Sequence, residues 1–380
     1  MNIRKIFCML LSMLMLFCSM GIVASALSDK DITAPSAVLM DADSGKLLYS
    51  KNPHEVRPCA SITKVMTLVL VMEAIDSGKI KLTDMVTASE HASSMGGSDI
   101  WLEPGEKMTV DDMVKATVVA SANDAAVALA EYICGSEDDF VAKMNEKAKQ
   151  LGMKETVFKN CNGLDEDGHV TSAYDVALMS KELIKHRKIF QYSGIWMDSL
   201  RGGKTQIVNT NKLLKSYSGI TGLKTGTTSK AGSCITATAE RDGLSLIAVV
   251  LGSASGKQRF KDAASLLDFG FANYTMYMPK TPDEAFTEIP VTGGMAKSVK
   301  TTAYISDRFL IGKGEDKDIQ YTVQLPESID APVKKGNTVG TIIYKNGSEQ
   351  VGKYPIMADD NVEEIRLWDI FALLIKATAA

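Results

Sequence analysis

Short apolar stretches flank a tight turn near the start of the chain. Apolar residues fill positions 38–40 and 47–49, and the turn residues Asp43-Ser44-Gly45 lie between them. The same pattern recurs at 235–239 and 244–252, around Arg241-Asp242-Gly243. These patterns predict two β-hairpins, over residues 37–50 and 235–252.

Between the hairpins the apolar positions recur with a helical period. This periodicity predicts helices over 61–76, 110–134, 137–151 and 172–186. Strands from both ends of a segment, with helices between them, indicate an antiparallel sheet whose faces are covered by helices. We therefore predict an α+β domain over residues 27–277.

The pattern changes after residue 277. Short β-like stretches such as 301–305 and 341–344 are interrupted by Pro279, Pro282, Pro290, Pro326 and Pro332. This pattern of short β-like stretches and prolines predicts a small all-β domain over 283–358.

The last segment, 359–380, has the pattern of an amphipathic helix. One side carries Ile365, Trp368, Ile370, Phe371, Leu374 and Ile375, and the other side carries Arg366, Asp369 and Lys376. Such a helix can lie in a membrane interface or pack on protein. We favour the membrane, although the acidic start of the segment gives no attraction to anionic lipid.

The first 26 residues have the pattern of a secretory signal peptide. Arg4 and Lys5 precede an apolar run over 6–23, which ends at Ala24-Ser25-Ala26. A membrane anchor is the alternative, because the run approaches the length of a span. The small residues favour cleavage after Ala26, so we expect an exported protein that is secreted or peripheral on the outer face of the cytoplasmic membrane.

Charge and ligand residues exclude several classes of function. Removing residues 1–26 takes away two positive charges and changes the formal net charge from -4 to -6, which does not favour nucleic acid. The histidines and remaining cysteines show no zinc-ligand spacing, so we expect neither metal nor cofactor. We interpret all four cysteines as small packing residues: Cys59, Cys134, Cys161 and Cys234.

Three short motifs follow one another in a fixed order. They are Ser61-Ile62-Thr63-Lys64, Ser121-Ala122-Asn123 and Lys224-Thr225-Gly226. Each motif alone is common by chance. Together, and in this order, they are typical of serine penicillin-recognising enzymes.

The first motif suits nucleophilic catalysis at the start of a helix. Lys64 lies one turn after Ser61 and therefore on the same face. A serine hydroxyl needs a base, and a lysine can act as one only if burial or a neighbouring positive charge lowers its pKa. We expect the apolar helix to supply burial and Lys224 to supply the charge. The free backbone N–H of Ser61 is a candidate oxyanion donor.

The other two motifs offer proton transfer and substrate binding. Ser121 could relay a proton to the leaving amine, and the Asn123 amide could hold both Lys64 and a substrate carbonyl. Lys224 and Thr225 are candidates to bind a substrate carboxylate. Gly226 would let the substrate backbone approach the strand.

The sequence resembles the low-molecular-mass penicillin-binding proteins of the D-alanyl-D-alanine carboxypeptidase family. Beyond the three motifs, the resemblance rests on Gly97 to Glu106, Asn162-Gly163-Leu164, Gly168-His169 to Asp175, and Asn209 to Leu214. It implies a β-lactamase/transpeptidase-like fold and removal of terminal D-alanine from peptidoglycan stem peptides through a Ser61 acyl-enzyme, with inhibition by β-lactams. It also implies that the backbone N–H of Thr227 is the second oxyanion donor. It gives His169 no catalytic part, so we expect a buried, hydrogen-bonded histidine, and we interpret Cys59 as packing.

Three other functions remain open. A β-lactamase shares the motifs, but the sequence has no convincing Glu-x-x-Leu-Asn segment for deacylation. A DD-endopeptidase that cuts peptidoglycan cross-links is barely separable by sequence. A wall-binding scaffold would not need Ser61, Lys64, Ser121, Asn123 and Lys224 to be intact.

Overall fold

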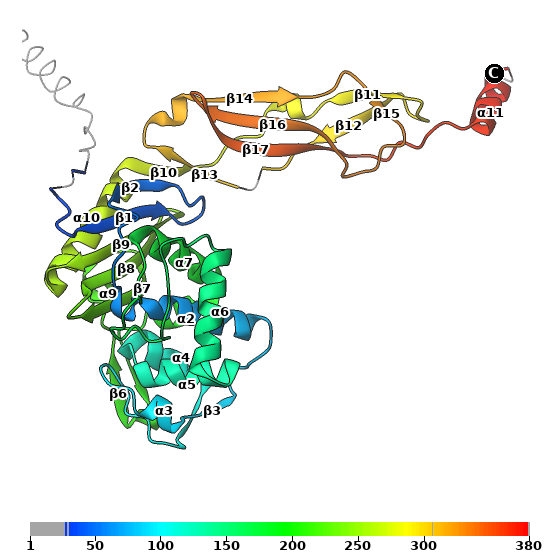
Figure 1. Cartoon of the computed structure of the whole chain (residues 1–380). Coiled ribbons are helices and arrows are strands. Elements are labelled where there is room, and N and C mark those ends of the chain that lie inside the picture. The colour runs from blue at the N-terminus through cyan, green and yellow to red at the C-terminus, as the bar shows by residue number, and fades with distance from the viewer. Residues whose placement is uncertain (1–26, 29, 306, 379–380) are drawn as a thin grey trace, which may run out of the picture. The chain divides into compact units, whose positions relative to one another are not determined.

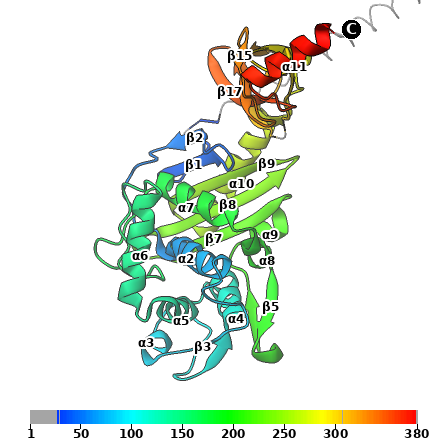
Figure 2. The same ribbon diagram turned by 90° about the vertical axis from the view of Figure 1, so that its right-hand side faces the viewer.

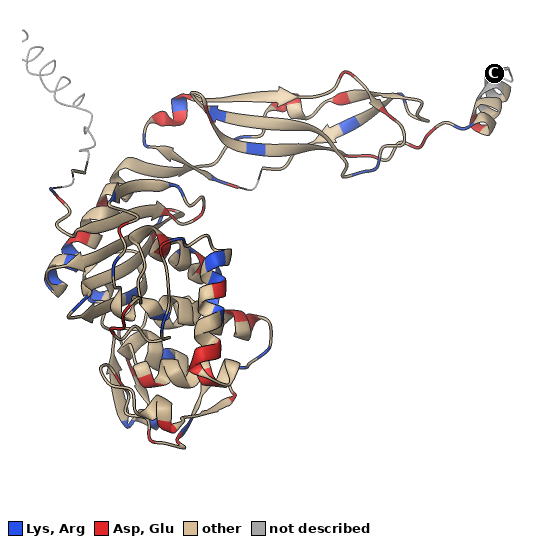
Figure 3. Cartoon of the chain, in the orientation of Figure 1, with Lys and Arg blue, Asp and Glu red and all other residues tan. Residues whose placement is uncertain are grey.

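The computed structural model describes residues 27–28, 30–305 and 307–378. The predicted signal peptide lies outside the described residues. Internal contacts divide the chain into two units, one that extends to Asn273 and one that begins at Tyr274. Acidic and basic residues are interspersed along the described parts of both units (Figure 3).

The first unit is built on a five-stranded antiparallel sheet (Figure 1). The strand order β2-β1-β9-β8-β7 makes β7 an edge strand and places both predicted hairpins in one sheet. The five strands are β1 (Ser36–Asp41), β2 (Leu47–Lys51), β7 (Ile220–Thr228), β8 (Gly232–Arg241) and β9 (Leu244–Ser253).

Helices cover both faces of this sheet (Figure 2). Alternate strand residues point to opposite faces. Val38 and Met40 of β1 therefore join the main core beside α2 and α7, whereas Leu39 faces α10, where a Cβ on Gly270 would lie 3.0 Å from Leu39 Cδ2. The α+β prediction is confirmed. The helices of this unit are α2 (Lys64–Asp76), α3 (Glu90–Ser93), α4 (Val110–Lys115), α5 (Asn123–Cys134), α6 (Glu137–Gln150), α7 (Ala173–Lys185), α8 (Phe190–Ser193), α9 (Leu213–Ser216) and α10 (Gly256–Asn273).

Shorter elements complete the first unit. Two small hairpins pair β3 (Met85–Thr87) with β4 (Lys107–Thr109) and β5 (Met197–Leu200) with β6 (Thr205–Val208). Three 3₁₀ turns are η1 (Ala60–Thr63), η3 (Arg187–Ile189) and η4 (Arg201–Gly203).

Local capping defines two of the predicted helices. The hydroxyl of Ser136 accepts a hydrogen bond from the Asp139 N–H at the start of α6, and Ser172 does the same with Asp175 at the start of α7. These caps satisfy first-turn N–H groups that have no partner within the helix.

The prediction of one continuous helix over 110–134 is wrong. The chain instead forms α4, a π-helical turn η2 (Ala116–Ala120) and α5. The break lies at Ser121, whose φ of 62° is left-handed and therefore incompatible with a continuing helix. Apolar periodicity cannot reveal this break, because the residues on both sides of it are buried alike.

The second unit is a β domain with a short helix at its end. Its larger sheet has the order β14-β16-β17-β12-β11-β15, and β10 pairs with β13. Phe309, Ile342, Tyr344 and Ile356 pack in its core. The bounds are β10 (Tyr274–Tyr277), η5 (Asp283–Ala285), β11 (Glu288–Thr292), β12 (Ser298–Thr302), β13 (Phe309–Gly312), η6 (Glu315–Lys317), β14 (Ile319–Gln324), β15 (Ile329–Asp330), β16 (Thr338–Asn346), β17 (Glu349–Ala358) and α11 (Leu367–Thr378).

Helix α11 exposes an apolar side. Leu367 and Trp368 are 74% and 80% exposed, and Phe371 and Ile375 are also largely exposed. Among the described helices, none combines the length and apolarity needed to cross a membrane.

Candidate active site

Ser61 lies in the turn η1, directly before the buried helix α2. The backbone at the preceding Ala60 is left-handed, with φ 51°, which turns the chain sharply into the helix. Two glycines allow this turn to pack closely. A Cβ on Gly163 would lie 2.0 Å from the Ala60 carbonyl oxygen, and a Cβ on Gly226 would lie 2.9 Å from the Ser61 nitrogen. The turn that carries Ser61 therefore packs between the backbone at Gly163 and the backbone at Gly226.

Lys64 is completely buried beside this serine. Its Nζ lies 3.1 Å from Ser61 Oγ and 2.7 Å from the carbonyl oxygen of Asn162, and it also donates to Asn123 Oδ1. A neutral amine has two hydrogens, which suffice for the two amide oxygens. Its lone pair is then free to accept the Ser61 hydroxyl proton.

Burial lowers the pKa of Lys64 to about 7, and the nearby charges of Asp99 and Asp124 act in the opposite direction. Sequence reasoning expected Lys224 to contribute to this shift. Burial, which was also expected, lowers this pKa, whereas Lys224 is not among its causes; Lys64 is among the causes that lower the pKa of Lys224. Desolvation thus favours the neutral form of the Lys64 amine.

The second motif lies at the break between η2 and α5. Ser121 is buried, and its Oγ accepts a hydrogen bond of 2.7 Å from Lys224 Nζ. Asn123 begins α5, and its Nδ2 donates to the Gly96 carbonyl at 2.6 Å while its Oδ1 accepts from Lys64. Because of the left-handed backbone at Ser121, one short motif contacts both lysines.

The third motif lies on the edge strand β7. Lys224 is 1% exposed, and the hydroxyl of Thr225 donates to Thr210 Oγ1 at 2.6 Å. Burial lowers the pKa of Lys224 well below its usual value. Gly226 was expected to admit substrate backbone, and the structure shows a further reason for glycine, since it abuts the protein's own turn at Cys59 to Ser61.

Arg259 of α10 belongs to the site, although sequence reasoning did not nominate it. Its Nη1 donates to Gly226 O at 2.8 Å and to Thr227 Oγ1 at 2.8 Å, and the residue is 8% exposed. It adds a positive charge behind the third motif. Neither a motif nor a spacing signals it, because it lies on a helix far along the chain from Lys224.

Asn162 and Thr210 also contact the motif residues. Both fall in stretches that carried the family resemblance, but no role was assigned to either residue. Only the tertiary contacts with Lys64 and Thr225 identify them.

His169 and Cys59 are both buried, as predicted from the sequence. His169 is 4% exposed and bonds through Nε2 to Thr63 Oγ1 at 2.7 Å, and burial lowers its pKa to about 4. Cys59 is fully buried, and burial raises its pKa to about 12. Cys161 and Cys234 are buried as expected, whereas Cys134 is only half-buried.

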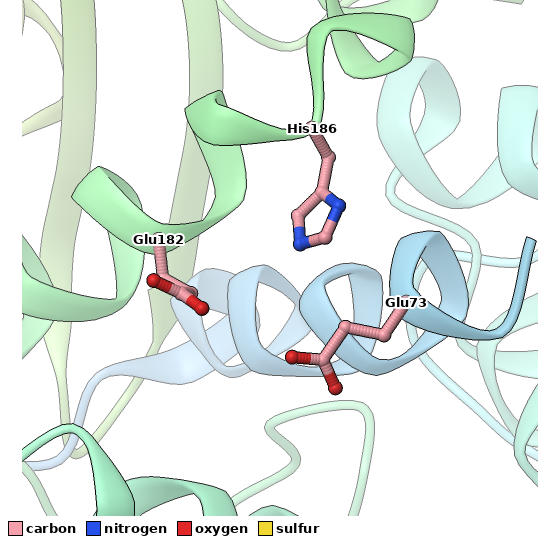
Figure 4. A group of neighbouring side chains, drawn as sticks. All are labelled: Glu73, Glu182 and His186. Carbon is pink, nitrogen blue, oxygen red and sulfur yellow. The ribbon is translucent and has the colours of Figure 1, made fainter. Parts of the chain in front are cut away.

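Among the described residues, one group of side chains has the composition of a metal site. Glu73, Glu182 and His186 each offer a ligand atom within 4.8 Å of the others (Figure 4). Lys147 Nζ lies 2.5 Å from Glu73 and 2.9 Å from Glu182, while His186 bonds to Asp76. A metal ion would have to displace this ammonium group, so the arrangement is that of an ion-pair network.

Comparisons with known proteins agree with the geometry. Residues 23–255 match the family described as D-alanyl-D-alanine carboxypeptidase, and residues 274–364 match the penicillin-binding protein 5 C-terminal domain. The chain is 45% identical over 335 residues to D-alanyl-D-alanine carboxypeptidase DacF of Bacillus subtilis (87% of this chain, 86% of the relative). It is 36% identical over 360 residues to DacC of Escherichia coli (90% of each chain).

Solved structures give the same result. Penicillin-binding protein 5 of Haemophilus influenzae matches with a TM-score of 0.76 at 32% identity, over 89% of this chain and all of that chain. Penicillin-binding protein D2 of Listeria monocytogenes in its ampicillin-bound form matches with a TM-score of 0.59 at 33% identity, over 64% of this chain and all of that chain.

Proposed function

This chain belongs to the D-alanyl-D-alanine carboxypeptidase family of serine peptidases, and on that premise we propose that Ser61 is its nucleophile and Lys64 its base. The protein is a hydrolase that removes the terminal D-alanine from peptidoglycan stem peptides. One observation carries the proposed roles: Ser61 Oγ lies 3.1 Å from a buried amine whose pKa is about 7. At that pKa a large fraction of Lys64 is neutral at physiological pH.

In the acylation step, Ser61 Oγ attacks the carbonyl carbon of the penultimate D-alanine while its proton moves to Lys64 Nζ. Asn123 Oδ1 and Asn162 O hold the lysine in place through both changes of charge. The N–H groups of Ser61 and Thr227 stabilise the oxyanion, since both lie where β7 abuts the serine turn.

Departure of the terminal D-alanine requires a proton on its amine. Ser121 relays to this amine the proton that Lys64 took from Ser61, so Lys64 returns to its neutral form, while Lys224 holds the Ser121 hydroxyl through a hydrogen bond of 2.7 Å. Lys224 and Thr225 bind the terminal carboxylate, and Arg259 adds positive charge behind them. Binding of a carboxylate raises the pKa of Lys224 again, because an opposite charge favours the ammonium form.

Water then hydrolyses the ester and frees Ser61. β-Lactams imitate the D-Ala-D-Ala end, so they acylate the same serine and leave slowly. The ampicillin and cefotaxime complexes of the Listeria relative support this proposal.

We also propose that the protein is exported and lies on the outer face of the membrane through α11. The apolar side chains of Leu367, Trp368 and Phe371 are largely exposed in the described structure, as an interfacial helix requires. Co-sedimentation with lipid vesicles tests this, since a chain ending at Arg366 should stay in the supernatant while the full mature chain sediments. Equal partitioning of the two chains would disprove a membrane role for α11.

The proposed site is tested by labelling with a fluorescent penicillin, followed by peptide mapping. The label should lie on the peptide that contains Ser61, and Ser61→Ala should take up none. Covalent label on the Ser61→Ala protein would remove Ser61 from the mechanism. Turnover of a D-Ala-D-Ala peptide, of penicillin and of cross-linked dimeric muropeptides then separates carboxypeptidase from β-lactamase and endopeptidase action.

A further inference from the structure

The segment from Gly96 to Glu106 has no helix or strand, but it is bound tightly to the second motif. Asn123 donates from Nδ2 to Gly96 O and from its backbone N–H to Ser98 O, both at 2.6 Å. A Cβ on Gly97 would lie only 2.9 Å from Asn123 Nδ2. The position of Asn123 thus depends on the position of this segment.

The middle of the segment is fixed from inside the protein. The buried carboxylate of Asp124 accepts hydrogen bonds from the N–H groups of Ile100 at 3.1 Å and Leu102 at 3.0 Å. Between them, Trp101 has a φ of 55°, which is unfavourable for a bulky residue. The segment therefore holds a conformation that it would not adopt unaided.

Arg201, at the end of the β5–β6 hairpin, fixes the segment from the other side. Its Nε and Nη2 donate to the two carboxylate oxygens of Glu106 at 2.6 and 3.0 Å. Its Nη1 donates to Ile100 O at 3.0 Å, and Nη2 lies 3.4 Å from Trp101 O. The planar guanidinium can bind the Glu106 carboxylate and the Ile100 carbonyl at the same time, which an ammonium group cannot do with the same geometry.

We propose that Arg201 is a positioning residue for the active site, which acts through segment 96–106 on Asn123 and thereby on Lys64. The contacts are continuous: Arg201 binds Ile100 and Glu106, the segment binds Asn123, and Asn123 binds Lys64. The inference rests on the proposed roles of Asn123 and Lys64. Loss of the guanidinium lets the segment move and water reach Lys64, because Asn123 loses its fixed acceptor at Gly96.

The test compares acylation by a β-lactam in the mature wild-type protein and in Arg201→Lys, Arg201→Ala and Glu106→Gln variants. The second-order acylation rate should fall about 10-fold to 100-fold in the Arg201 variants, the scale of a misplacement of roughly 1 Å. Lysine at position 201 should not restore the rate, because it keeps the positive charge but lacks the planar set of N–H donors that binds Glu106 and Ile100 together. The acidic limb of the pH profile should also move to higher pH, since better hydration raises the pKa of Lys64.

Lys115→Met is the matched control. Lys115 forms an ion pair of 3.2 Å with Asp198 of the same hairpin, but it does not contact segment 96–106 in any hydrogen bond or ion pair described. Its acylation rate should stay within about twofold of wild type. A double-mutant cycle of Arg201→Lys with Glu106→Gln should show non-additive losses, as expected for residues in direct contact.

Wild-type rates in the Arg201 variants, or a loss equal to that of Lys115→Met, would overturn the inference. So would a lower rate with an unchanged pH profile and additive effects in the cycle. If Arg201→Ala does not fold, Arg201→Lys and Glu106→Gln still decide. Failure of the proposed function can be told apart from failure of this inference, because the wild-type protein would then not be labelled at Ser61.

Discussion

The pKa of Lys64 predicts the pH dependence of acylation. A lysine with the ordinary pKa of 10.5 would be roughly 0.03% neutral at pH 7, whereas at a pKa of about 7 roughly half of Lys64 is neutral, a gain of about 10³-fold in active base. Only the neutral amine can accept the Ser61 proton. The acylation rate should therefore rise about tenfold per pH unit below pH 7 and level off above it.

Asp99→Asn sharpens this prediction. The Asp99 carboxylate raises the pKa of Lys64 through its charge, although burial dominates. Removing that charge should lower the pKa further, so the acidic limb should move to lower pH by a few tenths of a unit, on the order expected for a partly screened charge. The plateau rate should change little, because asparagine has the size and shape of aspartate and segment 96–106 should therefore keep its position.

Stopped-flow acylation by a chromogenic cephalosporin, between about pH 5.5 and 9, measures both profiles. A flat profile across pH 6 to 8, or an inflection near the ordinary lysine value, would refute the assignment of Lys64 as a base prepared by burial. If the acidic limb of the pH–rate profile moved to higher pH in the Asp99→Asn variant, the electrostatic reasoning would be refuted. Lys64→Met should abolish the acylation reaction at every pH in the range.

Three further substitutions test the packing. Gly226→Ala places a Cβ 2.8 Å from Cys59 O, so the acylation rate should fall about 10²-fold. Gly194→Ala is the control, because the atom nearest to its Cβ lies 3.7 Å away, and its acylation rate should be normal. Equal rates in the two variants would contradict the close-packing argument. Because Trp101 has a positive φ, Trp101→Gly should be more stable to urea than Trp101→Ala by about 1 kcal/mol, and the reverse order would contradict the assigned conformation. Lys147→Met should lower the free energy of unfolding by about 1–3 kcal/mol, because it leaves two glutamates facing one another; thermal unfolding with no change in midpoint would show that the network does not stabilise the fold.

The sequence predicted most of the architecture. The hairpins over 37–50 and 235–252 were recognisable because alternation and turn residues are local signals, and both lie in the sheet of the first unit. The helices over 137–151 and 172–186 were recognisable because helical periodicity is also a local signal, and both helices begin at a serine cap. The break at Ser121 was not recognisable, because a left-handed residue between two apolar runs leaves the period almost intact.

The residues that we propose to carry the chemistry could be nominated from local motifs alone. The three motifs named Ser61, Lys64, Ser121, Asn123 and Lys224 in chain order, and the structure brings all five together. A motif is local in the chain, so it can be identified without the fold.

The pKa values of those groups, and the further residues that contact them, depend on the fold. The low pKa of Lys64 comes from burial, which depends on everything packed around α2. Arg259 and Asn162 contact the motif residues from distant segments, and Arg201 contacts segment 96–106; no motif assigned a role to any of the three. Desolvation and long-range hydrogen bonds depend on neighbours in space, and the order of residues along the chain does not specify those neighbours.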